Sequence, residues 1–365
     1  MKKLGFGFMR LPMIGADVDI EQTKKMVDRF MADGFSYFDT AHVYIDGKSE
    51  IAMREALVKR YPREAYRIAD KLTWSTFESE EDIRRVFEEQ LQACGVTYFD
   101  YYLVHAMSAG KREKYENCNA YGVAAELKKA GKIRHLGMSF HDQPEVLDSI
   151  LTDHPETEFV QIQFNYLDYY SARIKSKECL DVCIKHGKPV IVMEPVKGGR
   201  LADLPTEAHD VFAALGGNMS DASYAVRFAA SAENVFMVLS GMSTLEQVED
   251  NTGFMKDFTP LNARELEACA AVWDICNRLD YGMCTGCRYC VPGCPAGIAI
   301  PDLMDAMNKK RRRGDEAAEA YHKAVTGAGS PHDCIECGAC EEVCPQKLKI
   351  RTLLPEIAKA FGESK

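Results

Sequence analysis

Eight cysteines near the C-terminus form two runs with the same spacing. The first run is Cys284-x2-Cys287-x2-Cys290-x3-Cys294 followed by Pro295, and the second is Cys334-x2-Cys337-x2-Cys340-x3-Cys344 followed by Pro345. Cysteine thiolates at this spacing are ligands of iron–sulfur clusters. Zinc sites more often use cysteine pairs with a longer spacer, and disulfide frameworks belong to small secreted chains. The duplicated run therefore predicts two 4Fe-4S clusters and a protein that transfers electrons.

The two runs resemble the ligand pattern of bacterial two-cluster ferredoxins, in which the fourth cysteine of each run binds the other cluster. The resemblance implies that one cluster is held by Cys284, Cys287, Cys290 and Cys344. It implies that the other is held by Cys334, Cys337, Cys340 and Cys294. Two helical patterns, broken near Arg313-Gly314, lie between the runs. A helical insert is similar to the α-helical ferredoxin modules of multi-subunit redox enzymes.

A second group of reactive side chains lies at the ends of predicted strands. Asp39 lies near the end of one predicted strand and Tyr44 follows it, Lys71 follows the next strand, and His105 ends the one after. A free tyrosine has a pKa near 10, and a nearby ammonium lowers it. We therefore expect Lys71 to lower the pKa of Tyr44, while Asp39 holds Lys71 charged and in position. His105 would hydrogen-bond a substrate carbonyl oxygen or share the proton, and Tyr44 would act as the general acid.

Each of these four residues also has a simpler explanation. Asp39 could cap a helix, Tyr44 could pack in the core and Lys71 could form a surface ion pair. A histidine at a buried strand end is more often part of the core than a catalyst. Their occurrence at successive strand ends nevertheless favours one shared catalytic site.

The elements that must position these residues follow a repeating pattern. Short apolar runs predict strands at 4–9, 36–40, 66–70, 100–105, 135–139, 159–165, 189–194 and 235–240. Amphipathic segments between and after them predict helices at 20–32, 50–60, 80–93, 123–130, 144–151, 177–186, 221–231 and 245–254. Eight β/α units in about 250 residues are typical of a TIM barrel. The rival is a doubly wound open sheet, but no G-x-G-x-x-G follows an early strand.

The predicted domain organisation is a (β/α)8 barrel over residues 1–258, a connecting helix over 259–280 and a small α-helical ferredoxin-like domain over 281–365. The basic run Lys309–Arg313 lies in the helical insert between the cysteine runs. It is interpreted as a solvated helix face, with a docking patch for an acidic electron carrier as the alternative.

Composition excludes several classes of function. The 365-residue chain has a formal net charge of −10, which argues against nucleic acid as a partner. No stretch approaches the ~20 apolar residues of a membrane span, and the start of the chain has no secretory signal. The cysteine content indicates a reducing cytoplasm, and exposed clusters favour an oxygen-poor cell.

At the strand-end residues the chain resembles the aldo-keto reductase superfamily. The matching stretches are Gly5-Phe6-Gly7, Phe38-Asp39-Thr40-Ala41-x-x-Tyr44, Gly47-x-Ser49-Glu50, Asp70-Lys71, Leu103-Val104-His105, Leu136-Gly137-Met138-Ser139 and Gln161-Ile162-Gln163-Phe164-Asn165. The resemblance covers residues 1 to about 258. It implies a bound nicotinamide cofactor and a catalytic tetrad of Tyr44, His105, Asp39 and Lys71. With the cysteine runs, the whole chain resembles the iron–sulfur-bearing branch of that superfamily.

The resemblance also implies the cofactor contacts. Ser139 and Gln161 match residues that hydrogen-bond the nicotinamide amide, although Phe140 stands where an asparagine usually follows the serine. Met193 replaces a tyrosine that commonly stacks on the nicotinamide ring. The other implied cofactor-binding residues are Gly7, Phe8, Met9, Val196, Gly198, Gly199, Ser240, Gly241, Gln247 and Asn251.

Among these, the Gly198-Gly199 loop is expected to approach a pyrophosphate, and Asn251 to contact the adenine. Gly241 and Gln247 stand where NADPH-preferring members carry Lys and Arg. The choice between NADP(H) and NAD(H) therefore stays open.

A nicotinamide transfers two electrons as a hydride, whereas each cluster transfers one, so a flavin is a third candidate cofactor. The first functional hypothesis is an oxidoreductase that interconverts a small-molecule carbonyl and an alcohol, with a ferredoxin or flavoprotein as electron partner. The alternative is an electron-transfer or redox-sensing subunit whose barrel binds nucleotide without carbonyl reduction. Tyr115, Phe140, Tyr166 and Phe212 are expected to line the substrate pocket.

Overall fold

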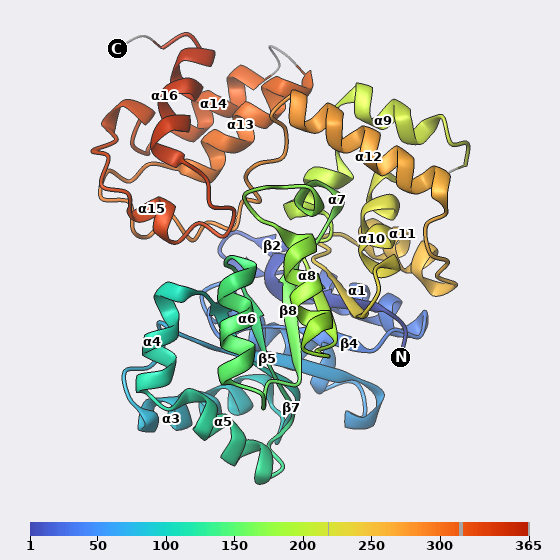
Figure 1. The fold of residues 1–365 in the computed structure, drawn as a ribbon, viewed down its shortest axis with the longest axis vertical. Coiled ribbons are helices and arrows are strands. Elements are labelled where there is room, and N and C mark those ends of the chain that lie inside the picture. Colours follow the sequence, from blue (N-terminus) through green and yellow to red (C-terminus); the bar gives the residue numbers. More distant parts are fainter. Residues whose placement is uncertain (218, 314–316, 364–365) are drawn as a thin grey trace. The chain divides into compact units, whose positions relative to one another are not determined.

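The computed structural model describes residues 1–217, 219–313 and 317–363. Eight parallel strands form a closed barrel in the order β1-β10-β9-β8-β7-β6-β5-β4 (Figure 1). The strands are β1 (Leu4–Gly7), β4 (Tyr37–Asp39), β5 (Arg67–Thr73), β6 (Phe99–Met107), β7 (Ile133–Phe140), β8 (Phe159–Gln163), β9 (Val190–Met193) and β10 (Val235–Ser240). The predicted (β/α)8 barrel is confirmed. A short hairpin, β2 (Met13–Ile14) with β3 (Asp17–Val18), was not predicted.

All eight predicted helices between and after these strands are present. They are α1 (Ile20–Ala32), α2 (Lys48–Met53), α3 (Glu80–Cys94), α5 (Ala120–Lys129), α6 (Pro144–Asp153), α8 (Ser176–Lys185), α10 (Asp221–Ser231) and α11 (Leu245–Lys256). A π-helical turn over Arg54–Val58 completes the segment that begins with α2. Between β6 and α5, where no element was predicted, the chain forms α4 (Ala109–Asn117).

The sequence explains where these helices begin and end, as α3 illustrates. The Ser79 side chain accepts a hydrogen bond from the backbone N–H of Asp82, and acidic residues occupy the first turn. Both features satisfy the positive N-terminal end of a helix. At the other end, Gly95 takes a left-handed conformation with φ 71°, which glycine adopts without a steric penalty.

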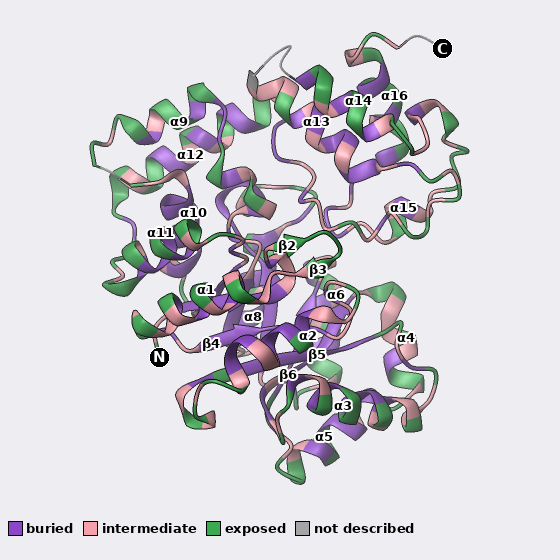
Figure 2. Cartoon of the chain, turned by 180° about the vertical axis from the view of Figure 1, so that it is seen from behind, coloured by how far each residue is buried: buried purple, intermediate pink, exposed green. Residues whose placement is uncertain are grey.

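Large side chains fill the interior of the barrel. The buried cluster there consists of Tyr37, Ala69, Leu103, Phe159, Ile191, Met237 and Leu239, and Figure 2 shows the strands as buried. A Cβ at Gly137 would lie 2.5 Å from the Phe159 ring, so glycine is required there for the ring to fit. Replacing a buried phenylalanine by alanine costs about 3–5 kcal/mol. The packed interior therefore stabilises the barrel whose strand ends carry the predicted site.

The chain folds into two compact units that do not follow the linear order of the sequence. The first contains residues 1–170, 175–195 and 226–261, and the second contains 171–174, 196–225 and 262–365. The predicted connecting helix is α12 (Ala263–Arg278), and it packs against α9 (Thr206–Ala213) within the second unit. The segment that follows β9 therefore belongs with the cysteine runs and not with the barrel.

The second unit has its own helical core. Its remaining main helices are α13 (Ile300–Arg313), α14 (Ala318–Val325) and α16 (Ile350–Ala360), and its buried residues include Leu303, Tyr321 and Leu354. The helical insert is thus present, although the break predicted at Gly314 lies outside the described residues. No helix in the described ranges combines the length and apolar character that crossing a bilayer requires.

The basic run in α13 is used within the second unit. Lys309 Nζ lies 2.9 Å from Asp305 Oδ2, and Arg311 Nη2 lies 3.1 Å from Asp280 Oδ2. Arg312 pairs with Asp203 and is only 11% exposed at its side chain. Arg311 and Arg312 are thus engaged in ion pairs within this unit, whereas Lys309 is exposed on the helix. The two interpretations of the run stay predictions.

Candidate active site and cluster module

Lys71 at the end of β5 is fully buried beside a carboxylate of the neighbouring strand. Its Nζ donates to Asp39 Oδ1 at 2.6 Å and to the carbonyl oxygen of Thr40 at 2.5 Å. Burial raises the pKa of Asp39, and the ammonium of Lys71 opposes that rise. The expected ion pair between Asp39 and Lys71 is present, and it anchors the ammonium at the C-terminal end of the barrel.

The other two predicted catalytic residues join this pair. Lys71 Nζ lies 4.7 Å from the centroid of the Tyr44 ring. The Tyr44 and His105 rings lie 5.8 Å apart at their centroids, in an edge-to-face arrangement. The structure therefore brings all four residues together, while their chemical roles remain predictions.

The pKa of Tyr44 moves in the direction opposite to the expectation. Burial, followed by the negative charges of Asp39 and Asp70, raises the pKa of Tyr44 well above its ordinary value. Lys71 lies near the face of the ring, and its ammonium donates to the oxygens of Asp39 and Thr40. Burial and the carboxylates set the direction, so the expected low pKa of Tyr44 is wrong for this structure. The consequence is that Tyr44 keeps its proton at neutral pH.

His105 is held in its neutral form by burial. Burial and the nearby charge of Lys71 lower the pKa of His105 well below its ordinary value. Its Nδ1 lies 2.7 Å from the hydroxyl oxygen of Thr73. Because no other acceptor in the described residues takes the Thr73 hydroxyl proton, that hydroxyl donates to Nδ1. The imidazole proton then resides on Nε2, where it can be donated to a substrate oxygen.

Thr73 was not singled out from the sequence, although strand periodicity placed it on the same face of β5 as Lys71. Side chains alternate between the two faces of a strand, so residues 71 and 73 of β5 share a face. Thr73 also pairs in register with His105 on β6.

A buried acidic group lies next to the tetrad and was also missed. The carboxyl oxygens of Glu50 and Asp70 and the sulfur of Cys94 all lie within 4.8 Å of one another. Burial, and then the charge of Glu50, raise the pKa of Asp70 well above its ordinary value. His42 Nδ1 lies 3.1 Å from Glu50, and this hydrogen bond raises the pKa of His42. Two carboxyl groups this close share a proton in preference to being ionised together.

Ser139 and Gln161 lie opposite each other in register on β7 and β8. Ser139 Oγ accepts the backbone N–H of Ala106 at 2.7 Å, and no acceptor in the described part of the chain takes its hydroxyl proton. Gln161 Nε2 contacts Met193 Sδ at 3.5 Å, whereas Gln161 Oε1 is buried with no partner among the described residues. A hydroxyl donor beside an amide acceptor complements a primary carboxamide, so these residues fit a nicotinamide.

The residues implied for the phosphate and adenine parts lie around the start of α11. Ser240 Oγ donates to Asn251 Oδ1 at 2.7 Å, and Gln247 Oε1 accepts the backbone N–H of Ser243 at 2.7 Å. Of the three residues after β1, Gly7 lies against Gly241, Phe8 is buried and Met9 is partly exposed.

Arg10 was not singled out from the sequence. Its side chain lies along Gly241, where an added Cβ would be 3.4 Å from Arg10 Cδ, and its carbonyl oxygen accepts the Ser243 hydroxyl. Its position just past the end of β1, where such barrels bind ligands, was the available signal. Arg10 thus places a cation beside Gly241, one of the two positions where Lys or Arg was expected for an NADPH-preferring member.

The glycine loop after β9 has a structural role within the second unit. A Cβ at Gly198 would lie 2.3 Å from the carbonyl oxygen of Thr285, and both Gly198 and Gly199 have positive φ. Glycine at 198 is thus required for the approach to Thr285. The contacts of Val196, Gly198 and Gly199 with a dinucleotide remain predictions.

The aromatic residues expected to line a substrate pocket are all buried in the protein. The Tyr115 hydroxyl lies 2.7 Å from the carbonyl oxygen of His105 and 3.0 Å from that of Leu72, so it shares its proton between β6 and β5. Phe212 stacks on Tyr224 in the second unit, with ring centroids 4.1 Å apart. The contact of these residues with a substrate stays a prediction.

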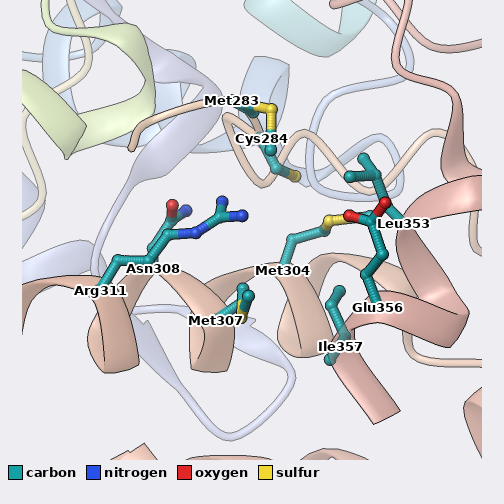
Figure 3. A pocket seen from close by; sticks show the side chains of 9 residues that line it. All are labelled: Met283, Cys284, Met304, Met307, Asn308, Arg311, Leu353, Glu356 and Ile357. Atoms are coloured by element: carbon teal, nitrogen blue, oxygen red, sulfur yellow. The ribbon is translucent and has the colours of Figure 1, made fainter. Parts of the chain in front are cut away.

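Seven of the eight cysteines lie in two groups that match the crossed arrangement. One cavity of the second unit is bordered by Cys284, Cys287, Cys290 and Cys344. Burial raises the pKa of Cys340 to about 11, with smaller contributions from Glu341, Cys334 and Cys294, so these thiols are neighbours. The residues therefore fit two clusters, and the ligand assignment remains a prediction. Cys284 also borders an adjacent pocket that α13 and α16 line with Met304, Met307 and Ile357 (Figure 3).

Comparison with known families decides the relationship. The model of the aldo/keto reductase family matches residues 3–274. This chain belongs to the aldo/keto reductase family. A second model, of a 4Fe-4S dicluster domain, matches residues 283–348. The chain therefore joins an aldo/keto reductase region to a 4Fe-4S dicluster domain.

Relatives of the family match this chain over part of their length. The NADH-specific methylglyoxal reductase of Escherichia coli (strain K12) is 29% identical over 185 residues, which are 46% of this chain and 54% of that protein. The 4-dihydromethyl-trisporate dehydrogenase of Mucor mucedo is 26% identical over 174 residues, 40% of this chain and 53% of that protein. The chain thus spans about half the length of these curated relatives.

Solved structures of the family share the fold. An aldo-keto reductase from Klebsiella pneumoniae in complex with NADPH superposes with a TM-score of 0.61 at 19% identity, covering 74% of this chain and 90% of that one. An aldo-keto reductase from Bacillus halodurans gives a TM-score of 0.60 at 24% identity, covering 74% and 91%.

Proposed function

We propose that this protein reduces an aldehyde or ketone to an alcohol with a nicotinamide dinucleotide, and that Tyr44 is the proton donor. The observation that supports this most strongly is the buried grouping of Tyr44 and His105 with the Asp39–Lys71 ion pair at one end of the barrel. A protein that only bound nucleotide would gain nothing from a buried proton donor beside a neutral imidazole.

Ser139 and Gln161 would hold the carboxamide of a nicotinamide, Ser139 as hydrogen-bond donor and Gln161 as acceptor. When bound, the nicotinamide supplies the hydride. His105 donates its Nε2–H to the carbonyl oxygen of the substrate and polarises that bond. Because the imidazole is neutral, it orients the substrate without giving up a proton.

Tyr44 transfers its hydroxyl proton to the oxygen of the substrate as negative charge develops there. Its raised pKa keeps the proton in place until an alkoxide, a stronger base, is formed. The ammonium of Lys71, 4.7 Å from the ring, then stabilises the phenolate that remains. Asp39 holds this ammonium in position.

We further propose that the second unit binds two 4Fe-4S clusters through the crossed ligand sets. Each cluster accepts one electron at a time, so a flavin, or a ferredoxin or flavoprotein partner, links the clusters to two-electron chemistry. Among the residues near the dinucleotide positions, Arg10 is the cation that supports a phosphate. Its presence is compatible with NADP(H) and with NAD(H).

The test is anaerobic oxidation of NADH and NADPH with a panel of aldehydes and ketones. Tyr44→Phe should lower kcat by about 10²–10⁴-fold while dinucleotide affinity is retained. The matched control is Tyr170→Phe, because Tyr170 is 49% exposed and outside the site. An active wild type whose rate is unchanged by Tyr44→Phe would show that Tyr44 is not the donor.

A different result would favour the alternative function. If the protein binds a dinucleotide but oxidises none with any carbonyl, the barrel serves an electron-transfer or redox-sensing subunit. The iron content tests the second unit separately, since two clusters require about eight iron atoms per chain.

A further inference from the structure

The segment Lys197–Ala202, directly after β9, is built into the surroundings of one predicted cluster. Gly198 lets its backbone approach Thr285, the residue after Cys284, so closely that a Cβ would lie 2.3 Å from the Thr285 oxygen. The loop thus touches the first cysteine run at its first ligand. This contact lies wholly within the second unit.

Arg200 extends this contact to the ligand itself. Its Nε donates to the carbonyl oxygen of Cys284 at 3.2 Å, and its Nη1 donates to Asp305 Oδ1 at 2.6 Å. The Arg200 side chain is 17% exposed, so its charge is only partly screened by water. The ion pair with Asp305 on α13 fixes the guanidinium beside Cys284.

Lys197 approaches the same predicted cluster from the other cysteine run. Its Nζ donates to Gln346 Oε1 at 2.7 Å, and both side chains are buried. Gln346 lies two residues after Cys344 and borders the cavity shared by Cys284, Cys287, Cys290 and Cys344. The segment Lys197–Ala202 therefore places Arg200 against Cys284 and Lys197 against Gln346. Both contacts lie next to predicted ligands of the same cluster, Cys284 and Cys344.

We propose that Lys197 and Arg200 raise the reduction potential of the cluster held by Cys284, Cys287, Cys290 and Cys344, so that an electron entering the second unit resides there. Reduction adds one electron to the cluster, and no bond is formed or broken. Four thiolates make the cluster anionic, and reduction makes it more so. The cations Lys197, which is buried, and Arg200, which is partly buried, favour that step, because cluster potentials depend on nearby charge, hydrogen bonds and solvent exposure.

This inference rests on the ligand assignment under the proposed function. It is tested on the full chain by anaerobic dithionite titration, with electron paramagnetic resonance as the readout. Cys340→Ser, which removes a ligand of the other cluster, identifies the signal of the cluster in question. The variants are Lys197→Gln and Arg200→Gln, and Lys197→Arg retains the charge.

We expect each neutral variant to lower the equilibrium constant for reduction of this one cluster by about tenfold, a shift of about 59 mV for one electron. Lys197→Arg should stay close to wild type. The control Arg278→Gln, at an exposed arginine paired with Glu207, should move neither cluster. If both clusters are present but neither neutral variant shifts the reduction potential of this cluster selectively, the inference is overturned and the proposed function stands. A wild type with no cluster signal would overturn both.

Discussion

The hydroxyl oxygen of Thr73 lies 2.7 Å from Nδ1 of His105, on the neighbouring strand and in register with it. Burial keeps this histidine neutral, so the choice between its two tautomers depends on that contact. A hydroxyl that donates to Nδ1 leaves the proton on Nε2. Thr73 is thus a positioning residue that acts through His105.

Thr73→Val should therefore lower kcat/KM for carbonyl reduction by about tenfold, which is about 1.4 kcal/mol and in the range of one hydrogen bond. Valine has nearly the same shape but no hydroxyl, so the imidazole is free to take the other tautomer. Thr73→Ser restores the donor and should recover most of the rate. Equal losses in both variants would point to a packing defect and contradict this role. Dinucleotide affinity should be unchanged throughout.

The raised pKa of Tyr44 makes the two directions of the reaction depend differently on pH. Reduction uses the protonated phenol, so its rate should stay level from about pH 6 to pH 9, below the ordinary tyrosine value of about 10. Alcohol oxidation needs the phenolate as base and should rise by about tenfold per pH unit over that range. Steady-state rates in both directions check this. A reduction rate that falls with a midpoint near pH 7 would contradict it.

The proton shared by Glu50 and Asp70 predicts a pH dependence of stability. The pKa of Asp70 is raised in the folded protein from 3.8, so between that value and the raised one the folded state holds a proton that the unfolded state has lost. Stability is therefore full below the unfolded pKa and falls as pH rises, by at most about 1.4 kcal/mol per pH unit.

Asp70→Asn removes this proton linkage and should flatten the decline that begins above the unfolded value of 3.8. Urea midpoints of the full chain, followed by circular dichroism, measure the difference. The other ionisable groups of this cluster, His42, Glu50 and Cys94, are unchanged in the variant, as is the neighbouring Lys71. Asp17→Asn, at a carboxylate that is 81% exposed at its side chain, should leave the slope as in wild type. Parallel slopes for Asp70→Asn and wild type would exclude a shared proton.

The sequence was sufficient for the barrel because its evidence is local. Each strand is a short apolar run and each helix has an apolar face, so all eight units could be assigned. The tetrad followed because parallel strands end at one edge of a barrel. The helix α4 was missed because Ala109–Asn117 is almost wholly polar, and only Tyr115 in it is buried.

The sequence did not indicate how deeply the site residues are buried or which distant segments of the chain are in contact. The sign of the Tyr44 pKa shift depends on burial and on the nearby carboxylates Asp39 and Asp70, which raise it. The contact between Gly198 and Thr285 joins residues far apart in the chain, and no local pattern indicates it. The meeting of Glu50 with Asp70 depends likewise on where α2 places its side chains against β5.

The two glycines of the loop after β9 provide a matched pair of substitutions. Both have positive φ, so alanine at either costs about 1–3 kcal/mol of backbone strain. Only at 198 would the new Cβ also meet backbone, 2.3 Å from the Thr285 oxygen, whereas nothing lies within 4 Å at 199. Gly198→Ala should therefore lower the iron content of anaerobically purified protein much more than Gly199→Ala. Equal iron contents would show that the loop is not needed to hold the first cysteine run.

Crossed ligation can be tested by combining substitutions in the two cysteine runs. Cys344→Ser and Cys290→Ser remove ligands of the same predicted cluster, so each variant, and the double variant, should retain about four of about eight iron atoms. Cys344→Ser combined with Cys340→Ser removes a ligand from both clusters, although these two cysteines lie in the same run, and should leave almost none. If each run instead held its own cluster, the double variant at Cys344 and Cys290 would lose almost all its iron. The double variant at Cys344 and Cys340 would then retain about four iron atoms. Iron analysis of the three single and two double variants therefore separates the two arrangements, because the loss follows the cluster and not the order of the cysteines in the chain.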